Sequence, residues 1–117
     1  MVDRKQLAID FAKSLNHLEI NKIILYGSVV RGDDTKESDI DILIITEDRK
    51  KIQDKVYSKV ADILLEMEEH VSAKILTNKD YNRVKNTHFI STVEKEGIII
   101  GWWKNTIYWS ITRVEQC

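Results

Sequence analysis

The chain has 117 residues, of which 43% are hydrophobic and 32% are charged, and its net charge is −1. This composition excludes a disordered chain, and the lack of an apolar run of about 18 residues argues against a membrane-spanning helix. A near-neutral charge argues against a free-standing nucleic-acid-binding protein, which usually carries a clear basic excess. The single cysteine, Cys117, cannot form an internal disulfide, so we expect one cytoplasmic domain.

Helical and extended patterns alternate along the chain. Apolar residues spaced three and four apart indicate helices, and short runs rich in β-branched residues indicate strands. In chain order, the patterns predict a helix at 3–16, a strand at 22–26, a short helix from 28, a loop at 32–37, a strand at 39–46, a helix at 49–68, a strand at 71–77, a helix at 78–86, a short helix ending at 96 and a strand at 98–103. Asp3 and Asn78 are expected to cap the helices that follow them. The strongest helical stripe consists of Ile52, Val56, Val60, Ile63 and Met67.

This order of elements predicts an α/β (α+β) fold, with a mixed sheet of about four strands flanked by helices over residues 1–101. Residues 102–117 form a tryptophan-rich extension. Apolar and polar residues alternate within it, which predicts a C-terminal hairpin, in which an edge strand of the same domain pairs with 98–103. The alternative is a surface for a dimer or a partner, because Trp and Tyr are favoured in interface cores.

Two aspartates open the second predicted strand. Asp39 and Asp41 are two residues apart, so both side chains leave the same face, roughly 6.5–7 Å apart along the strand. Leu43 and Ile45 continue that face, which places the carboxylates at the end of a buried strand. Oxygen ligands so placed can bind hard divalent cations, and without a cation they would repel each other. Alone, such a pair is more often a solvated strand end.

A glycine and a serine follow the first predicted strand. Gly27 permits a tight turn and a close approach of the backbone to a phosphate. If Ser28 begins a helix, its amide and hydroxyl can hold a phosphate oxygen. Arg31, one turn further on, could contact a phosphate or a carboxylate of the site. Together with the aspartates, these residues predict a phosphate-binding turn that faces a metal-binding pair.

The run Gly27-Ser28-x-x-Arg31-Gly32-(x)5-Ser38-Asp39-x-Asp41 resembles the signature of the polymerase-β-like nucleotidyltransferase superfamily. The short chain is most similar to the minimal nucleotidyltransferase family. The match is specific over residues 22–46 and extends more loosely to about residue 101, where the ending Glu96-Gly97-Ile98 fits. The tail from residue 102 is not covered.

The resemblance implies a nucleotidyltransferase domain over residues 1–101, with a nucleoside triphosphate as donor and Mg²⁺ as cofactor. It implies that Gly27 and Ser28 contact the phosphates and that Asp39 and Asp41 bind the metal. We also expect Arg31 to bind the phosphates and the two aspartates to be catalytic. In toxin–antitoxin pairs of this family, the enzyme is similar to an antitoxin that transfers AMP from ATP to a tyrosine of a HEPN-type toxin partner.

The superfamily usually has a third carboxylate on a later strand of the sheet. Here the face of strand 71–77 that we assign to the site carries His70, Ser72 and Lys74, none of which is a carboxylate. His70 could act as the general base, because its ordinary pKa of about 6.5 suits proton transfer. Alternatively, transfer proceeds slowly with two carboxylates, or the chain is a nucleotide- or partner-binding antitoxin with little catalysis. Glu68 or Glu69 could provide the third carboxylate only if the strand began earlier than residue 71.

Overall fold

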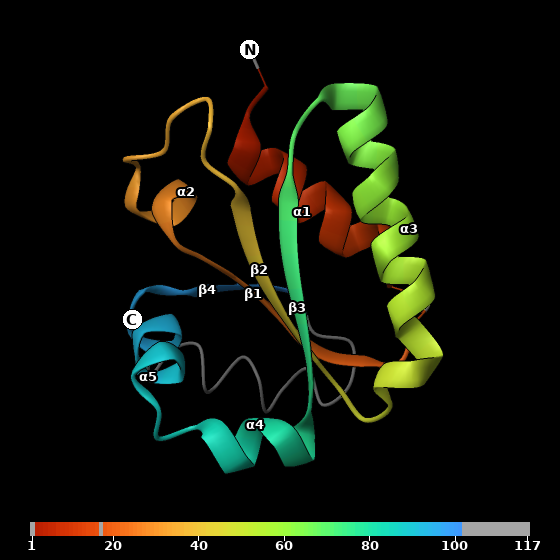
Figure 1. Cartoon of the computed structure of the whole chain (residues 1–117), viewed down its shortest axis with the longest axis vertical. Coiled ribbons are helices and arrows are strands. Elements are labelled where there is room, and N and C mark those ends of the chain that lie inside the picture. Colours follow the sequence, from red (N-terminus) through yellow and green to blue (C-terminus); the bar gives the residue numbers. More distant parts are fainter. Residues whose placement is uncertain (1, 17, 102–117) are drawn as a thin grey trace.

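The computed structural model describes residues 2–16 and 18–101. In chain order these residues form α1 (Arg4–Ser14), β1 (Ile20–Tyr26), α2 (Ser28–Arg31), β2 (Ile40–Thr46), α3 (Arg49–Met67), β3 (Val71–Thr77), α4 (Asn78–Val84), α5 (His88–Glu96) and β4 (Ile98–Gly101). The predicted order of helices and strands is confirmed over this part of the chain (Figure 1).

The strands form one mixed sheet in the order β3-β2-β1-β4. β1 is antiparallel to both of its neighbours, β2 and β4, whereas β2 and β3 are parallel. Parallel neighbours need a crossover, and α3 provides it (Figure 1). The predicted four-stranded mixed sheet is therefore confirmed. Because of these strand directions, β1 ends at the same end of the sheet at which β2 and β3 begin.

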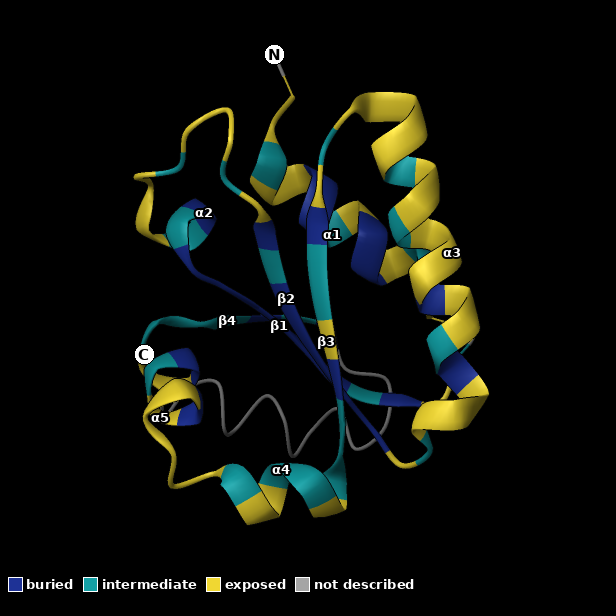
Figure 2. Ribbon diagram, in the orientation of Figure 1, coloured by how far each residue is buried: buried dark blue, intermediate teal, exposed yellow. Residues whose placement is uncertain are grey.

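One face of the sheet packs against α1 and α3. Its core joins apolar residues of both helices to inward-facing residues of all four strands, such as Leu25 and Ile42, which are fully buried. Figure 2 shows the buried residues concentrated in β1 and β2, while the outer side of α3 is exposed. The predicted helical stripe of α3 is only partly correct, because Ile52 and Val56 are buried but Met67 is 47% exposed. The last turns of α3 extend beyond the sheet (Figure 1).

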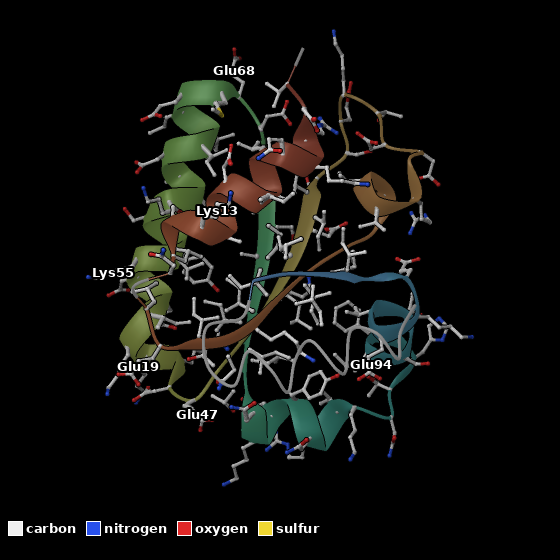
Figure 3. All side chains as sticks on the ribbon, turned by 180° about the vertical axis from the view of Figure 1, so that it is seen from behind. Lys13, Glu19, Glu47, Lys55, Glu68 and Glu94 are labelled. Carbon is white, nitrogen blue, oxygen red and sulfur yellow. The ribbon has the colours of Figure 1, made fainter. Side chains whose placement is uncertain are left out.

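The other face of the sheet packs against α4 and α5. Ile90 and Val93 of α5 contact a cluster that includes Leu43 and Ile45 of β2, as the alternation along this strand predicted. Tyr81 of α4 donates a hydrogen bond to Glu94 of α5, which links the two helices (Figure 3 labels Glu94). On this face of β2, Asp41 is half-buried whereas Leu43 and Ile45 are buried, so the second layer covers the strand less fully near its start.

Some predicted boundaries were wrong. β2 begins at Ile40, so Asp39 lies just before the strand rather than in it. Thr77, not Asn78, caps α4, because its hydroxyl accepts the Asp80 N–H. The cap at Asp3 is confirmed, since its carboxylate accepts the Gln6 N–H. The predicted C-terminal hairpin lies outside the described residues. None of the helices within 2–16 and 18–101 has the length and apolar character needed to cross a membrane.

Gly97 joins α5 to β4 in a space too small for a side chain. A Cβ there would lie 2.4 Å from the Val93 carbonyl oxygen and 2.6 Å from Ile24 Cγ2. We expect Gly97→Ala to lower the free energy of unfolding by roughly 1–3 kcal/mol, because backbone would have to shift to admit the methyl group. Urea unfolding measures the change. Ser91→Ala, on the exposed side of α5, is the control, and equal stability of the two variants would contradict the packing argument.

Tyr26 is buried in the second layer, and its pKa reports that environment. Burial first, and then the negative charge of Asp41, raise the pKa of Tyr26 to about 12 from 10.0. Because an unfolded tyrosine ionises near pH 10, this stabilisation is present below that pH and is lost as the pH rises to about 12. We expect Tyr26→Phe to lose less unfolding free energy than the wild type over that range. Tyr57→Phe, on the exposed side of α3, should follow the wild type, and identical slopes for all three proteins would refute this reading.

Candidate active site at the Gly27 turn

Asp41 lies at the end of the sheet where β1 ends and where β2 and β3 begin. Its Cα pairs with that of Tyr26 on β1 and with that of Ser72 on β3. Its side chain points to the face covered by α4 and α5, as do Leu43 and Ile45 further along the strand. Asp41 is half-buried, so its carboxylate is reachable from solvent while its strand is fixed in the core.

Asp39 precedes β2 and faces the start of β3. Asp39 Oδ1 lies 2.9 Å from His70 Nδ1, and both side chains are about half exposed. The backbone holds the two segments together as well, because the Ile40 N–H donates to the His70 carbonyl oxygen. His70 therefore orients one of the two carboxylates, and its second ring nitrogen is left to other partners.

The two aspartates lie close enough to repel each other. Burial is the larger cause of a raised pKa at Asp41, and the charge of Asp39 is the second. Lys74 and Arg31 act in the opposite direction, and Glu96 adds to the increase. A divalent cation would relieve this concentration of negative charge.

The donor set fits Mg²⁺, because both groups are carboxylates and this ion prefers oxygen ligands. Within the described part of the chain, no three His, Cys, Asp or Glu side chains are arranged to hold an ion. A cation on Asp39 and Asp41 would therefore complete its coordination with oxygens from phosphate or water.

Gly27 forms the turn that ends β1 and packs directly on Asp41. Its φ is +83°, which L side chains rarely adopt. A Cβ at Gly27 would lie 2.3 Å from Asp41 Oδ2, so a side chain there would displace the carboxylate, and the backbone conformation of φ 83° and ψ −156° is essentially restricted to glycine. The short helix α2 runs from Ser28 to Arg31, and Gly32, which caps its end, also has a positive φ. The sequence motif thus becomes a backbone turn in contact with a site carboxylate.

The guanidinium group of Arg31 is bonded to two carboxylates in this structure. Its Nε donates to Asp33 Oδ2 at 3.2 Å, and its Nη1 donates to Glu96 Oε1 at 3.1 Å. The same Glu96 oxygen accepts the Gly27 N–H at 3.2 Å. The side chain of Arg31 is still 48% exposed, so part of the guanidinium faces solvent. Arg31 therefore bonds the carboxylates of Asp33 and Glu96 rather than the predicted aspartate pair, and its expected contact with phosphate stays a prediction.

The strand that usually supplies a third carboxylate in the superfamily has Ser72 beside Asp41, as the sequence indicated. Val71, Ala73 and Ile75 of β3 pack in the α1/α3 core, so Ser72 and Lys74 face the site side as predicted. Glu69 is paired with Arg4 at 2.9 Å. Glu68 is exposed beyond the end of α3 and points away from the molecule (Figure 3).

The acidic residue that sequence reasoning missed is Glu96, which comes from α5. The only signal for it was the resemblance of the Glu96-Gly97-Ile98 ending to the family, because no spacing rule links residue 96 to a turn at residue 27. Hydrogen bonds to Gly27 and Arg31 bring Glu96 to the site.

Comparisons with known proteins found relatives in sequence and in fold. A protein of Methanocaldococcus jannaschii named as a protein adenylyltransferase is 35% identical over 92 residues, which cover 79% of this chain and 89% of that protein. A crystal structure of a mutant of the toxin–antitoxin MntA-HpeT has a TM-score of 0.58 at 14% identity, covering 98% of this chain and 86% of that one. A crystal structure of a toxin–antitoxin with AMP-PNP has a TM-score of 0.55 at 14% identity and covers 97% and 86% of the two chains.

The sequence model of the polymerase beta nucleotidyltransferase family matches residues 9–102, which include the Gly27 turn and both aspartates. This match covers most of the chain and confirms the resemblance carried by the motif. The chain belongs to the polymerase beta nucleotidyltransferase family.

Proposed function

We propose that this protein transfers AMP from ATP to a hydroxyl group of a partner protein. In this reaction the acceptor oxygen forms a bond to the α-phosphorus, the bond from that phosphorus to the β-phosphate oxygen breaks, and pyrophosphate leaves. The observation that carries the proposal is the contact between the Gly27 turn and Asp41, where a Cβ would lie 2.3 Å from the carboxylate. A phosphate-binding backbone and a cation-binding carboxylate are thereby next to each other.

The residues have separate tasks in this proposal. Asp39 and Asp41 hold the metal ion, and Mg²⁺ when bound neutralises phosphate charge and aligns the acceptor with the leaving group. Gly27, Ser28 and Arg31 orient the phosphates by backbone N–H groups, a hydroxyl and a guanidinium. The protein's contribution is thus mainly positioning and electrostatic stabilisation.

His70 is the side chain best placed to take the acceptor's proton. Its Nδ1 bonds Asp39, and its half-exposed ring can be approached by an incoming hydroxyl. Ser72, which pairs with Asp41, cannot act as a base near neutral pH. We therefore assign proton removal to His70 or to solvent rather than to β3.

The partner that we propose is a HEPN-type toxin, modified on a tyrosine. Two structures similar to this chain are those of toxin–antitoxin proteins, one of them with AMP-PNP, and a relative at 35% identity is named for transfer of adenylyl groups to protein. An acceptor on a protein also suits the exposure of Asp39 and His70, because a tyrosine on another chain could approach them from solvent.

A second candidate function is an antitoxin that neutralises its partner by contact, with little or no transfer. The observation in its favour is that Ser72, beside Asp41, stands where the superfamily usually has a third carboxylate. Asp39 and Asp41 are needed for the transfer of AMP in the first function, whereas neutralisation by contact in the second function does not require transfer.

Substitution of Asp41 separates these functions. We expect the purified chain, with Mg²⁺ and ATP labelled in the α-phosphate, to label the protein encoded beside its gene. Asp41→Asn should lower the rate of transfer by on the order of 100-fold or more, because it replaces one of the two negatively charged metal ligands by a neutral amide. Asp54→Asn, on the exposed side of α3, is the matched control. Equal labelling by both variants would contradict the assigned site, and neutralisation of the partner without any labelling would favour the second candidate.

The Gly27 turn offers a test by nucleotide binding alone. Gly27→Ala and Gly32→Ala both add a methyl group at a positive φ. At Gly27 (φ 83°, ψ −156°) the methyl group meets Asp41 in a conformation essentially restricted to glycine, whereas at Gly32 (φ 81°, ψ 14°) the backbone is left-handed helical and nothing lies within 4 Å of a Cβ. We expect Gly27→Ala to abolish measurable binding of Mg²⁺–AMP-PNP in calorimetry. Gly32→Ala should bind within about threefold of wild type while losing roughly 1 kcal/mol of stability. If both variants bind normally, the turn does not hold the phosphates.

A further inference from the structure

Glu96 joins the second layer of the fold to the phosphate-binding turn. Its Oε1 accepts two hydrogen bonds, from the Gly27 N–H at 3.2 Å and from Arg31 Nη1 at 3.1 Å. These donors lie at the two ends of the turn, one before Ser28 and one at the end of α2. One carboxylate oxygen thus fixes the peptide plane of Gly27 and the position of the guanidinium at the same time.

The backbone of Glu96 has little freedom to move. Gly97 follows it and packs so closely on Val93 and Ile24 that no side chain fits. Ile98 then pairs with Leu25 on β1, two residues before Gly27. Gly27 lies two residues after Leu25 on β1, and Glu96 lies two residues before its partner Ile98 on β4, so the two are held near each other and the Glu96 side chain reaches the Gly27 N–H.

Arg31 is held at both ends of its guanidinium group. Nε bonds Asp33 in the loop after α2, and Nη1 bonds Glu96. A planar group fixed at two points keeps one orientation, and its exposed edge can still donate to a bound anion. The Glu96 side chain itself is 24% exposed, less than Asp33 at 63%, so Glu96 provides the better-shielded contact.

We propose that Glu96 is a positioning residue for the nucleoside triphosphate, because its carboxylate holds Gly27 and Arg31 in the arrangement that receives the phosphates. This inference rests on the proposed function, since it assigns a role within the same site. The opposite reading is that Glu96 occupies the place of a phosphate and must be displaced. The fixed backbone at Glu96 and Gly97 favours positioning, and the two readings predict opposite signs for the effect of removing the carboxylate.

Three substitutions of Glu96 separate the effect of side-chain length from the effect of charge. Glu96→Gln keeps an oxygen at the same distance but loses the charge, Glu96→Asp keeps the charge but is too short, and Glu96→Ala loses both. If positioning is the role, Mg²⁺–AMP-PNP should bind about tenfold more weakly to the Ala and Asp variants, and within about threefold of wild type to the Gln variant. Glu66→Gln, exposed on α3, is the control and should bind as wild type does.

Calorimetry with Mg²⁺–AMP-PNP gives the binding constants, and thermal melting of each variant verifies that it is folded. In the transfer assay, the KM for ATP should rise in the Ala and Asp variants while kcat at saturating ATP stays within about threefold. If either the Ala or the Asp variant does not fold, the other still tests whether the carboxylate must extend to Gly27 and Arg31.

Tighter binding by Glu96→Ala would overturn the inference in favour of a displaced carboxylate. Weak binding by Gln together with normal binding by Asp would overturn it in favour of charge alone. Equal binding of Mg²⁺–AMP-PNP by the wild type and all variants would refute the positioning role of Glu96 without affecting the proposed function. Failure of the wild type to bind Mg²⁺–AMP-PNP would instead remove the proposed function, and this inference with it.

Discussion

The pairing of β1 with β2 is the constraint on which the site depends. In this antiparallel pair Tyr26 lies opposite Asp41, so the turn that ends one strand lies beside the carboxylate that opens the other. Gly27 is in contact with Asp41 for this reason, and its backbone conformation favours glycine strongly. The crossover through α3 then brings β3 in parallel to β2, which adds His70 and Ser72 at the same edge. Three segments separated in sequence thereby converge on one small region of the sheet.

This convergence carries an electrostatic cost. Asp39 and Asp41 repel each other, and Glu96 adds a further negative charge, so the pKa of Asp41 is raised. Arg31 and Lys74 offset only part of this charge. A fold selected for stability alone has no reason to keep acidic groups together at a half-buried position. Sites that bind a cation and a charged substrate tolerate such local conflict, because ligand binding relieves it.

The second layer has a role beyond covering apolar surface. α5 buries Ile90 and Val93 against the sheet, and this packing fixes the position at which the helix ends. Gly97 then allows a close turn into β4, and Glu96 is left facing the Gly27 turn. The acidic residue that completes the surroundings of Gly27 and Arg31 therefore comes from a helix, whereas the strand that usually supplies one in the superfamily presents Ser72. Arg4 makes a comparable link on the other side of the sheet, where it joins Glu69 to the carbonyl oxygens of Thr35 and Lys36.

The sequence by itself determined the elements and the residue types of the site. Spacing of apolar residues predicted the helices and strands, because burial on one face imposes a period, and the Gly27-Ser28 and Asp39-x-Asp41 motifs predicted a turn beside a carboxylate pair. Boundaries such as Asp39 and Thr77 were missed by a residue, since capping and strand ends depend on single hydrogen bonds. Only the tertiary structure decided the strand order and the contacts of Arg31. The role of Glu96 could not be read from the chain, because its partner lies 69 residues away and their contact exists only once β1 and β4 have paired.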